Sequence, residues 1–373
     1  MLGRRTGIIR LAFAILPIIT GIFLAYLFLS DFTEFNMPYR VVKPFYYYTA
    51  ILLTGTVLAV LALKHYDNRL PLKKSSLWNY IRVVLGALWL LDGVLQIQPE
   101  MSFGFAPFVL IPALKALPSV LQPLAQPIIF AWASNQSIMD ALSAVFQVFL
   151  GLGFLTLRSR RGVSAIAFLS FAWAIAIWIF GESFGSPGIG MSILTGFPGA
   201  ALLYAIASSL LLFDFSQKTE VWILQYSLAS VFLISAILQA VPANGYWNSG
   251  SIASVTGPWA FIFEPKALSY MLYNVAVVLS NNMVPWNLLL TLSLLATGLS
   301  WILKPKAAAI ASTAFSAIIW VIGQDFGVLG GYGTDPNTGL VLVLLSTALY
   351  FTYREKSVKD SNLPENYGVP LGE

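Results

Sequence analysis

One pattern of eight residues occurs twice in this chain, as WIFGESFG at 178–185 and as WVIGQDFG at 320–327, 142 positions later. A second pair, LQIQP at 95–99 and LQAVP at 238–242, has almost the same offset of 143 positions. Two separate patterns that share one offset predict a duplicated unit in the chain.

The composition limits where such a unit can fold. Of the residues, 58% are hydrophobic and only 10% are charged, whereas soluble domains carry about 25% charged residues. Several apolar runs approach the roughly 20 residues that a helix needs to cross a bilayer while satisfying its own backbone. We therefore predict an all-α polytopic membrane protein with about ten transmembrane helices, at 8–29, 46–64, 78–97, 139–157, 163–181, 193–213, 222–241, 285–303, 306–323 and 338–353.

These spans group into two four-helix repeats that follow a two-helix N-terminal extension. Because four is an even number, both copies must insert in the same orientation, which predicts a parallel repeat. The expected units are the extension at 1–75, the repeats at 76–216 and 217–355, and a polar cytoplasmic tail at 356–373. In each repeat a long segment rich in Pro and aromatic residues follows the first span, and we expect it to form short helices over the bundle.

The distribution of basic residues predicts the orientation. One set of loops, together with the termini, holds 17 of the 21 Lys and Arg residues, and such an excess marks the cytoplasmic side. We expect a multi-pass protein of the cell membrane, with both termini in the cytoplasm and the lipid bilayer as its surroundings. The net charge of +5 follows from these loops, so nothing in the sequence supports binding to nucleic acid.

Residues that usually hold metals are scarce. The chain contains no Cys, and its one His is His65. Thiolate sites, bis-His haem, His-rich metal sites and a Ser-His-Asp triad are therefore excluded. We predict no metal site and no intrinsic cofactor, and no residue stands out as catalytic.

A carboxylate inside the third predicted span needs an explanation. Asp92 lies near Gln96 and Trp89 on one helical face, and a central Asp costs about 3 kcal/mol on insertion. The face is either a site for a ligand or for protons, or a hydrogen-bonded clamp between helices near the membrane surface.

Polar residues also end the helices that carry the repeated pattern. Glu182 and Gln324 are equivalent, each four positions after a Trp, and Gln239 is the equivalent of Gln96. We predict a polar vestibule on the outer side; the alternative is ordinary helix ends with an interfacial aromatic belt. The candidate ligand-binding residues are Trp89, Asp92, Gln96, Trp178, Glu182, Gln239, Trp320, Gln324 and Asp325.

The segment before the last span, TDPNTG at 334–339, has the composition of a helix start. Asp335 precedes a Pro that suits the first helical turn, which predicts a cap. Asp335 and Asn337 also offer oxygen ligands for a hard cation, although their spacing matches no EF-hand loop.

The stretch from Arg82 to Gly93 resembles the DoxX/DoxD-like integral membrane families. Those families open a four-helix unit with an Arg, a Gly and a further small residue, followed by a Pro at the outer end, and Arg82, Gly86, Gly93 and Pro99 fill these places. The resemblance covers about 78–213. It implies a membrane subunit associated with a quinone-linked respiratory or sulfur-oxidation complex, with quinone as the ligand and with membrane or extracytoplasmic subunits as partners. It does not supply catalytic residues.

Two other functions stay open, and the sequence does not decide whether the protein is an enzyme. A parallel repeat is compatible with a small-solute transporter, although few charges lie at mid-membrane. A structural or assembly protein that anchors an extracytoplasmic partner is the third possibility.

Overall fold

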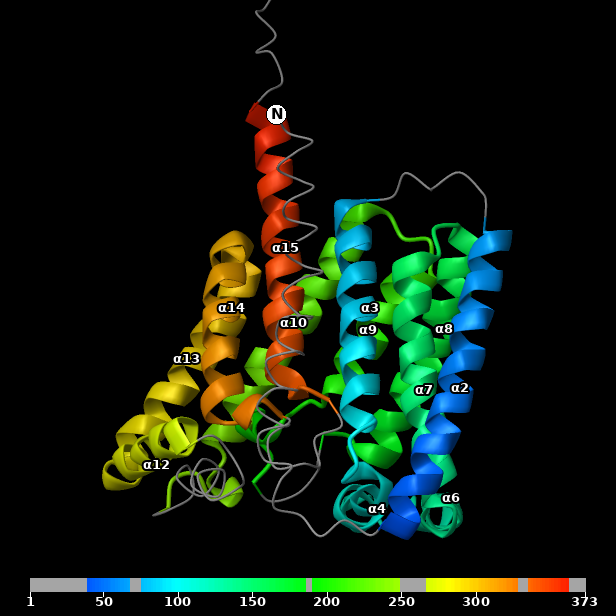
Figure 1. Ribbon diagram of the computed structural model, residues 1–373. Coiled ribbons are helices and arrows are strands. Elements are labelled where there is room, and N and C mark those ends of the chain that lie inside the picture. Colours follow the sequence, from blue (N-terminus) through cyan, green and yellow to red (C-terminus); the bar gives the residue numbers. More distant parts are fainter. Residues whose placement is uncertain (1–38, 68–74, 186–189, 249–265, 328–334, 362–373) are drawn as a thin grey trace, which may run out of the picture.

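The computed structural model describes residues 39–67, 75–185, 190–248, 266–327 and 335–361, and within these ranges it consists of helices and connecting turns without a strand (Figure 1). Seven of the described helices are long and apolar enough to cross a membrane. The prediction of an all-helical membrane protein is confirmed at this level. The seven are α2 (Tyr39–Tyr66), α3 (Ser76–Gln96), α7 (Gln136–Thr156), α8 (Arg160–Ala176) with its extension η2 (Ile177–Gly181), α10 (Gln217–Ala240), α13 (Met283–Leu303) and α14 (Pro305–Ile322).

The other three predicted spans have different outcomes. The span at 8–29 lies outside the described residues, and the last one falls within α15 (Asn337–Ser361). The span at 193–213 is shorter than predicted, because only α9 (Ala200–Leu212) is α-helical there, after a single 3₁₀ turn, η3 (Ile193–Thr195). Gly196 and Gly199, with φ of 99° and 98°, interrupt the helix, since such angles do not occur inside one.

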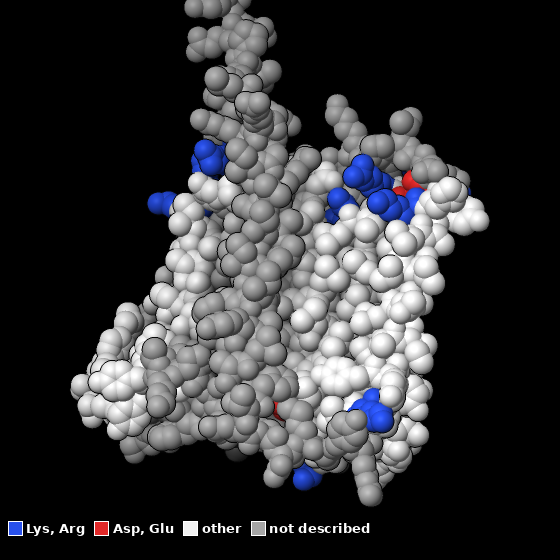
Figure 2. Space-filling model, viewed as in Figure 1, with Lys and Arg blue, Asp and Glu red and all other residues white. Residues whose placement is uncertain are grey.

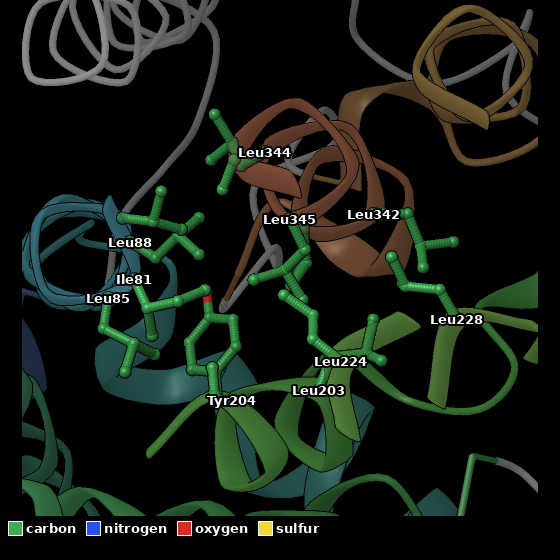
Figure 3. Packing of buried hydrophobic residues seen from close by; sticks show 14 of the residues in the cluster. Ile81, Leu85, Leu88, Leu203, Tyr204, Leu224, Leu228, Leu342, Leu344 and Leu345 are labelled. Carbon is green, nitrogen blue, oxygen red and sulfur yellow. The ribbon is translucent and has the colours of Figure 1, made fainter. Parts of the chain in front are cut away.

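The long helices form two groups that meet along one interface (Figure 1). In the first group α3 packs on α7, α8 packs on α9, and α2 covers α7. In the second group α10 packs on α13 and α14 packs on α15. Where the groups meet, α3 and α9 contact α10 and α15. Leu and Ile side chains from these four helices, together with Tyr204, form the buried core there (Figure 3).

Glycines let α3 and α7 approach closely. A Cβ at Gly93 would lie 2.6 Å from the Val148 side chain, and one at Gly86 would lie 2.8 Å from Leu155. Arg82 donates a hydrogen bond to the carbonyl oxygen of Phe154. Small residues allow this kind of backbone approach between membrane helices. Three of the residues that carry the family resemblance therefore hold α3 against α7.

The segment after α3 forms short helices, as expected. These are α4 (Met101–Phe105), the π-helical η1 (Ala106–Leu110), α5 (Ile111–Ala116) and α6 (Gln122–Ser134). Met101, Leu110 and Ile129 are among the buried residues of a small apolar cluster of their own, against which Phe180 and Phe184 pack. The segment thus covers the ends of α3, α7 and α8 that lie away from the basic loops, and we call it the cap.

Basic side chains gather at the other end of the molecule. On the face drawn in Figure 2, most Lys and Arg lie at the end opposite α4 and α6. Arg160, the first residue of α8, pairs with Asp214 at 2.9 Å. The separation of the basic side chains agrees with the excess of Lys and Arg in one set of loops of the sequence. The orientation in a membrane stays a prediction.

Candidate functional site: an acidic cavity with aromatic walls

A cavity of about 310 Å³ lies between the first group of helices and the cap. Its walls come from α3, α7, the end of α8 with η2, and the start of α9, and α4, η1 and α6 of the cap also line it. Two of these wall segments, η1 and η2, are π-helical, a geometry that often occurs at functional sites. Six of the lining side chains are aromatic: Trp89, Phe105, Trp132, Trp173, Phe180 and Tyr204.

Asp92 is the most deeply placed acid of the cavity, with only 2% of its surface exposed. The Tyr204 hydroxyl donates a hydrogen bond to its Oδ1 at 3.2 Å. The rings of Trp89 and Tyr204 are in edge-to-face contact, with 4.8 Å between their centroids. The indole nitrogen of Trp89 donates a hydrogen bond to the Ser170 hydroxyl at 2.7 Å. Packing and hydrogen bonds therefore fix the side chains around Asp92.

Glu182 directly follows η2 and reaches the start of α9. Its carboxylate accepts hydrogen bonds from the Ala201 amide at 3.1 and 3.3 Å, and the N-terminus of a helix is a favourable place for a carboxylate. Burial raises the pKa of Glu182 from its ordinary value of 4.5 to about 8, and the nearby negative charge of Asp335 contributes to the increase. Glu182 thus takes up a proton at a higher pH than an ordinary Glu side chain does.

A third carboxyl group, that of Asp335, comes from the second group of helices. Asp335 lies two residues before the start of α15, and its Oδ1 accepts a hydrogen bond from the Asn337 amide at 2.6 Å. This bond closes a turn ahead of the helix, while the role of Asp335 as a helix cap stays a prediction. Asp335 also lines the cavity together with Asp92 and Glu182. No Lys, Arg or His is among the described residues that line the cavity with these three acids.

Two polar groups of the cavity wall have no partner. The Oε1 atom of Gln147 and the indole Nε1 of Trp173 are buried without a hydrogen bond within the described structure. Gln147 is only 2% exposed, and buried polar groups normally find a partner. Both residues line the cavity, so these two unpaired atoms lie in its wall. Sequence reasoning missed both residues, although a Gln in the middle of the span 139–157 was a usable signal.

The structure brings four of the nine candidate residues together. Trp89, Asp92, Gln96 and Glu182 line the cavity, where Gln96 accepts a hydrogen bond from Ser143 at 2.7 Å. The other five are Trp178, Gln239, Trp320, Gln324 and Asp325, and none of them is among the lining residues.

Two of the remaining five make contacts between the two groups of helices. Gln239 accepts from Ser192 at 2.6 Å and donates to Asn287 at 2.6 Å. Gln324 donates to the Ile193 carbonyl at 2.7 Å and accepts from the Gly339 amide at 2.8 Å. Both side-chain amides therefore form hydrogen bonds with neighbouring segments of the chain. Asp325, beside Gln324, is also buried.

The two indoles of the repeated pattern have the same role. Trp178 donates to the Pro198 carbonyl at 2.8 Å, and Trp320 donates to the Pro336 carbonyl at 2.7 Å. After each Trp the backbone turns with positive φ, at 48° for Ser183 and at 45° for Asp325. The indoles thus hold a tight turn against the segment that precedes the next helix.

The second group of helices has a cavity of a different character. Its volume is about 610 Å³, and apart from Asn274 and Ser293 its lining is apolar or aromatic, from α12 (Lys266–Asn281), α13, α14 and η3. It contains no carboxyl group among the described residues. Acids and unpartnered polar atoms are therefore features of the first cavity. Within the described part of the chain, no group of three or more His, Cys, Asp or Glu residues is arranged to hold a metal ion.

The chain matches no protein-family model, and neither the curated proteins nor the solved structures contain a significantly similar one. The resemblance to DoxX/DoxD-like proteins therefore stays a prediction, and a functional assignment depends on the residues that line the cavity.

Proposed function

We propose that this protein binds the ring of a quinone-class molecule in the acidic cavity, as the membrane subunit of a quinone-linked respiratory or sulfur-oxidation complex. One observation carries the proposal: six aromatic side chains, Trp173 among them, line a cavity whose wall also includes Gln147, and the indole Nε1 of the one and the Oε1 of the other are buried without a hydrogen bond in the described structure. Small-molecule sites commonly combine an apolar lining with a few such polar groups.

The chemistry of the cavity suits an aromatic ring. Trp89, Trp132 and Phe180 offer faces and edges against which a flat ring stacks favourably. A quinone exchanges protons at its two oxygens whenever its redox state changes. Asp92 and Glu182 are acids beside the bound ring, and they would exchange these protons, while the electrons would come from or go to a partner subunit.

We also propose that the second group of helices is a copy of the first. The Trp178 and Trp320 contacts are equivalent, and so are two serine pairs, Ser170 with Ser208 and Ser312 with Ser346, each 2.7 Å apart. The ten spans, the cytoplasmic termini and the place in the cell membrane belong to the same proposal, supported by the basic residues at one end of the helices.

Transport of a small solute is the second candidate function. The observation that favours it is the charge of the cavity, in which three carboxyl groups face no cationic side chain among the described residues. A positively charged organic solute would balance them, and the aromatic walls would stabilise it through cation–π contacts.

Binding of a short-chain quinone to the purified protein in lipid nanodiscs tests the main proposal. We expect saturable quenching of tryptophan fluorescence by a soluble dimethoxy-methyl-benzoquinone, because three indoles line the cavity. Asp92→Asn combined with Glu182→Gln, or Trp173→Phe, should weaken binding by about tenfold or more. Trp222→Phe is the control, since Trp222 is exposed on α10 away from the cavity. Quenching that does not saturate, or that the cavity variants leave unchanged, would refute the proposal.

A further inference from the structure

We infer that the exposed surface of the cap lies in the lipid of the membrane and not in water, and that the acidic cavity opens sideways into this lipid between α6 and the end of α8. Neither part depends on which ligand the cavity holds. Three features support it: the charge of the cap, the exposure of its side chains, and the character of the lining residues at the open side of the cavity.

The cap is almost free of charge. In the stretch 101–134, Lys115 is the one charged residue, and its side chain is exposed. A Lys side chain can lay its carbon chain along apolar surface and keep its ammonium group among polar headgroups. Soluble domains, in contrast, carry about 25% charged residues. The composition of the cap therefore suits contact with lipid better than contact with water.

Large apolar side chains of the cap are exposed. Leu124 and Ile128 lie one turn apart on one face of α6 and are 66% and 52% exposed, and Phe108 on η1 is 60% exposed. Leu58, on the membrane-compatible helix α2, is exposed to a similar extent, at 62%. Exposed apolar groups that lie together mark a surface that contacts a membrane or another protein.

The open side of the cavity is apolar. The polar lining residues from α3 and α7 are at most 5% exposed; they are Asp92, Gln96, Ser143 and Gln147. Ile128 is the only described lining residue with more than half of its surface exposed. The cavity thus has a deep polar side and an apolar side that faces outwards at α6.

The exposed face of α8 leads to this open side. Leu169 is 36% exposed and lies on the same helical face as Trp173 and Ala176, because these follow it by four and seven positions. Trp173 and Ala176 are half-buried and line the cavity. The segment Arg160–Gly181 is long and apolar enough to cross a membrane, so this face would meet lipid. Continuity with α8 therefore favours lipid as the surroundings of the cap.

An opening towards water is the alternative. Glu182 and Asp335 are half-buried lining residues as well, and an opening beside these two acids would lead to an aqueous space. Both are less exposed than Ile128, which favours the apolar side. A ligand dissolved in the bilayer would then enter without crossing water, and a long hydrocarbon tail would stay in the lipid while the ring occupied the cavity.

Spin labels on single cysteines test the surroundings of the cap. The chain contains no Cys, so Leu124→Cys and Ile128→Cys each carry one label in the full chain in lipid nanodiscs. We expect these labels to collide more often with oxygen, which dissolves in lipid, than with a water-soluble nickel chelate, as at Leu58→Cys. Lys218→Cys, at an exposed position in the first turn of α10, is the control in water. Phe108→Cys replaces an α6 variant that does not fold.

Quenching by lipids with brominated acyl chains tests the sideways opening. Bromine quenches an indole only on contact, so the fluorescence that Trp173 contributes should be lost in brominated lipid. We expect Trp173→Phe to reduce the intensity that bromine quenches. Trp301→Phe is the matched control and should leave this intensity unchanged, because Trp301 is 0% exposed. The label at Ile128, which lines the cavity, is the second measurement of the opening.

The outcomes decide the two parts separately. Labels at Leu124 and Ile128 that respond like the label at Lys218 would overturn the placement of the cap in lipid and favour a protein partner that covers it in the native membrane. An unchanged quenched intensity in Trp173→Phe would overturn the sideways opening and favour an entrance beside Glu182 and Asp335. Neither measurement uses a quinone, so failure of this inference is distinguishable from failure of the proposed function.

Discussion

The carboxylate of Glu182 fills the space in which any residue other than glycine at position 199 would carry its side chain. A Cβ on Gly199 would lie 2.2 Å from Glu182 Oε2, and the backbone of Gly199 has a φ of 98°. Such a contact is too short, and such an angle is strained for other residues. Gly199 therefore acts as a positioning residue for Glu182.

Gly199→Ala should displace this carboxylate. We expect about tenfold weaker quinone binding and a loss of about 1–2 kcal/mol in the free energy of unfolding, from the strained φ together with the steric contact. Fluorescence titration and thermal denaturation in nanodiscs measure the two effects. Gly55→Ala is the matched control, because a Cβ at Gly55 meets nothing within 4 Å. Equal behaviour of the two variants would show that Gly199 does not position Glu182.

The two serine pairs offer a test of the Trp89 contact. Ser170→Ala removes the acceptor of the Trp89 indole and the partner of Ser208, so we expect ligand binding to weaken by several-fold. Ser312→Ala breaks the equivalent pair with Ser346, which is remote from the acidic cavity. Each variant should cost about 1 kcal/mol of stability. A loss of binding in Ser312→Ala of the same size would contradict a specific role of Trp89.

Stability should depend on pH through Glu182. Because its pKa is raised from 4.5 to about 8 in the folded protein, the folded state binds more protons than the unfolded state between these values. Stability is therefore greatest below pH 4.5 as far as this group is concerned, and it falls as the pH rises towards 8. Glu182→Gln should flatten the decrease in thermal midpoint between pH 5 and pH 8. A decrease of unchanged size in the variant would assign the effect to another group.

The contact between α3 and α7 should not tolerate a large side chain. In Gly93→Leu the new side chain would meet Val148 and the Ala144 carbonyl, for which the Cβ distances are already 2.6 and 2.9 Å. We expect a loss of several kcal/mol, as for other overpacked interfaces, seen as aggregation during size-exclusion chromatography in detergent. Gly55→Leu should elute like the unchanged protein. A monodisperse Gly93→Leu variant would show that the two helices separate without cost.

Part of the site could be predicted from the sequence because it follows from one helix. Asp92 and Gln96 are one turn apart on α3, so helical periodicity places them on one face, and the cost of a carboxylate in a membrane favours the inside. Glu182 could be found because the repeated pattern singles it out. Both inferences need only the spacing of residues within one short segment of the chain.

The rest of the site depends on packing between distant elements. Asp335 approaches the cavity from the other group of helices, and no spacing in the sequence gives this contact. The sequence does not tell which of Trp173 and Trp178 lines the cavity, because this depends on how the end of α8 and the π-helical η2 orient the two side chains. The early part of the span 193–213 was predicted as helix because its apolar run does not reveal that Gly196 and Gly199 have positive φ angles.

Asp335 lines the acidic cavity from the second group of helices, and Leu194 of the first group lines the apolar cavity of the second. Each half thus lends one wall residue to the other. If both halves descend from a single ancestral unit, that unit had to meet a second copy of itself before either cavity was complete. Once two copies were joined in one gene, the deletion of one copy would have left the cavity of the other without one of its wall residues. The exchange of wall residues would then favour retention of both copies, even after the two cavities diverged in chemistry.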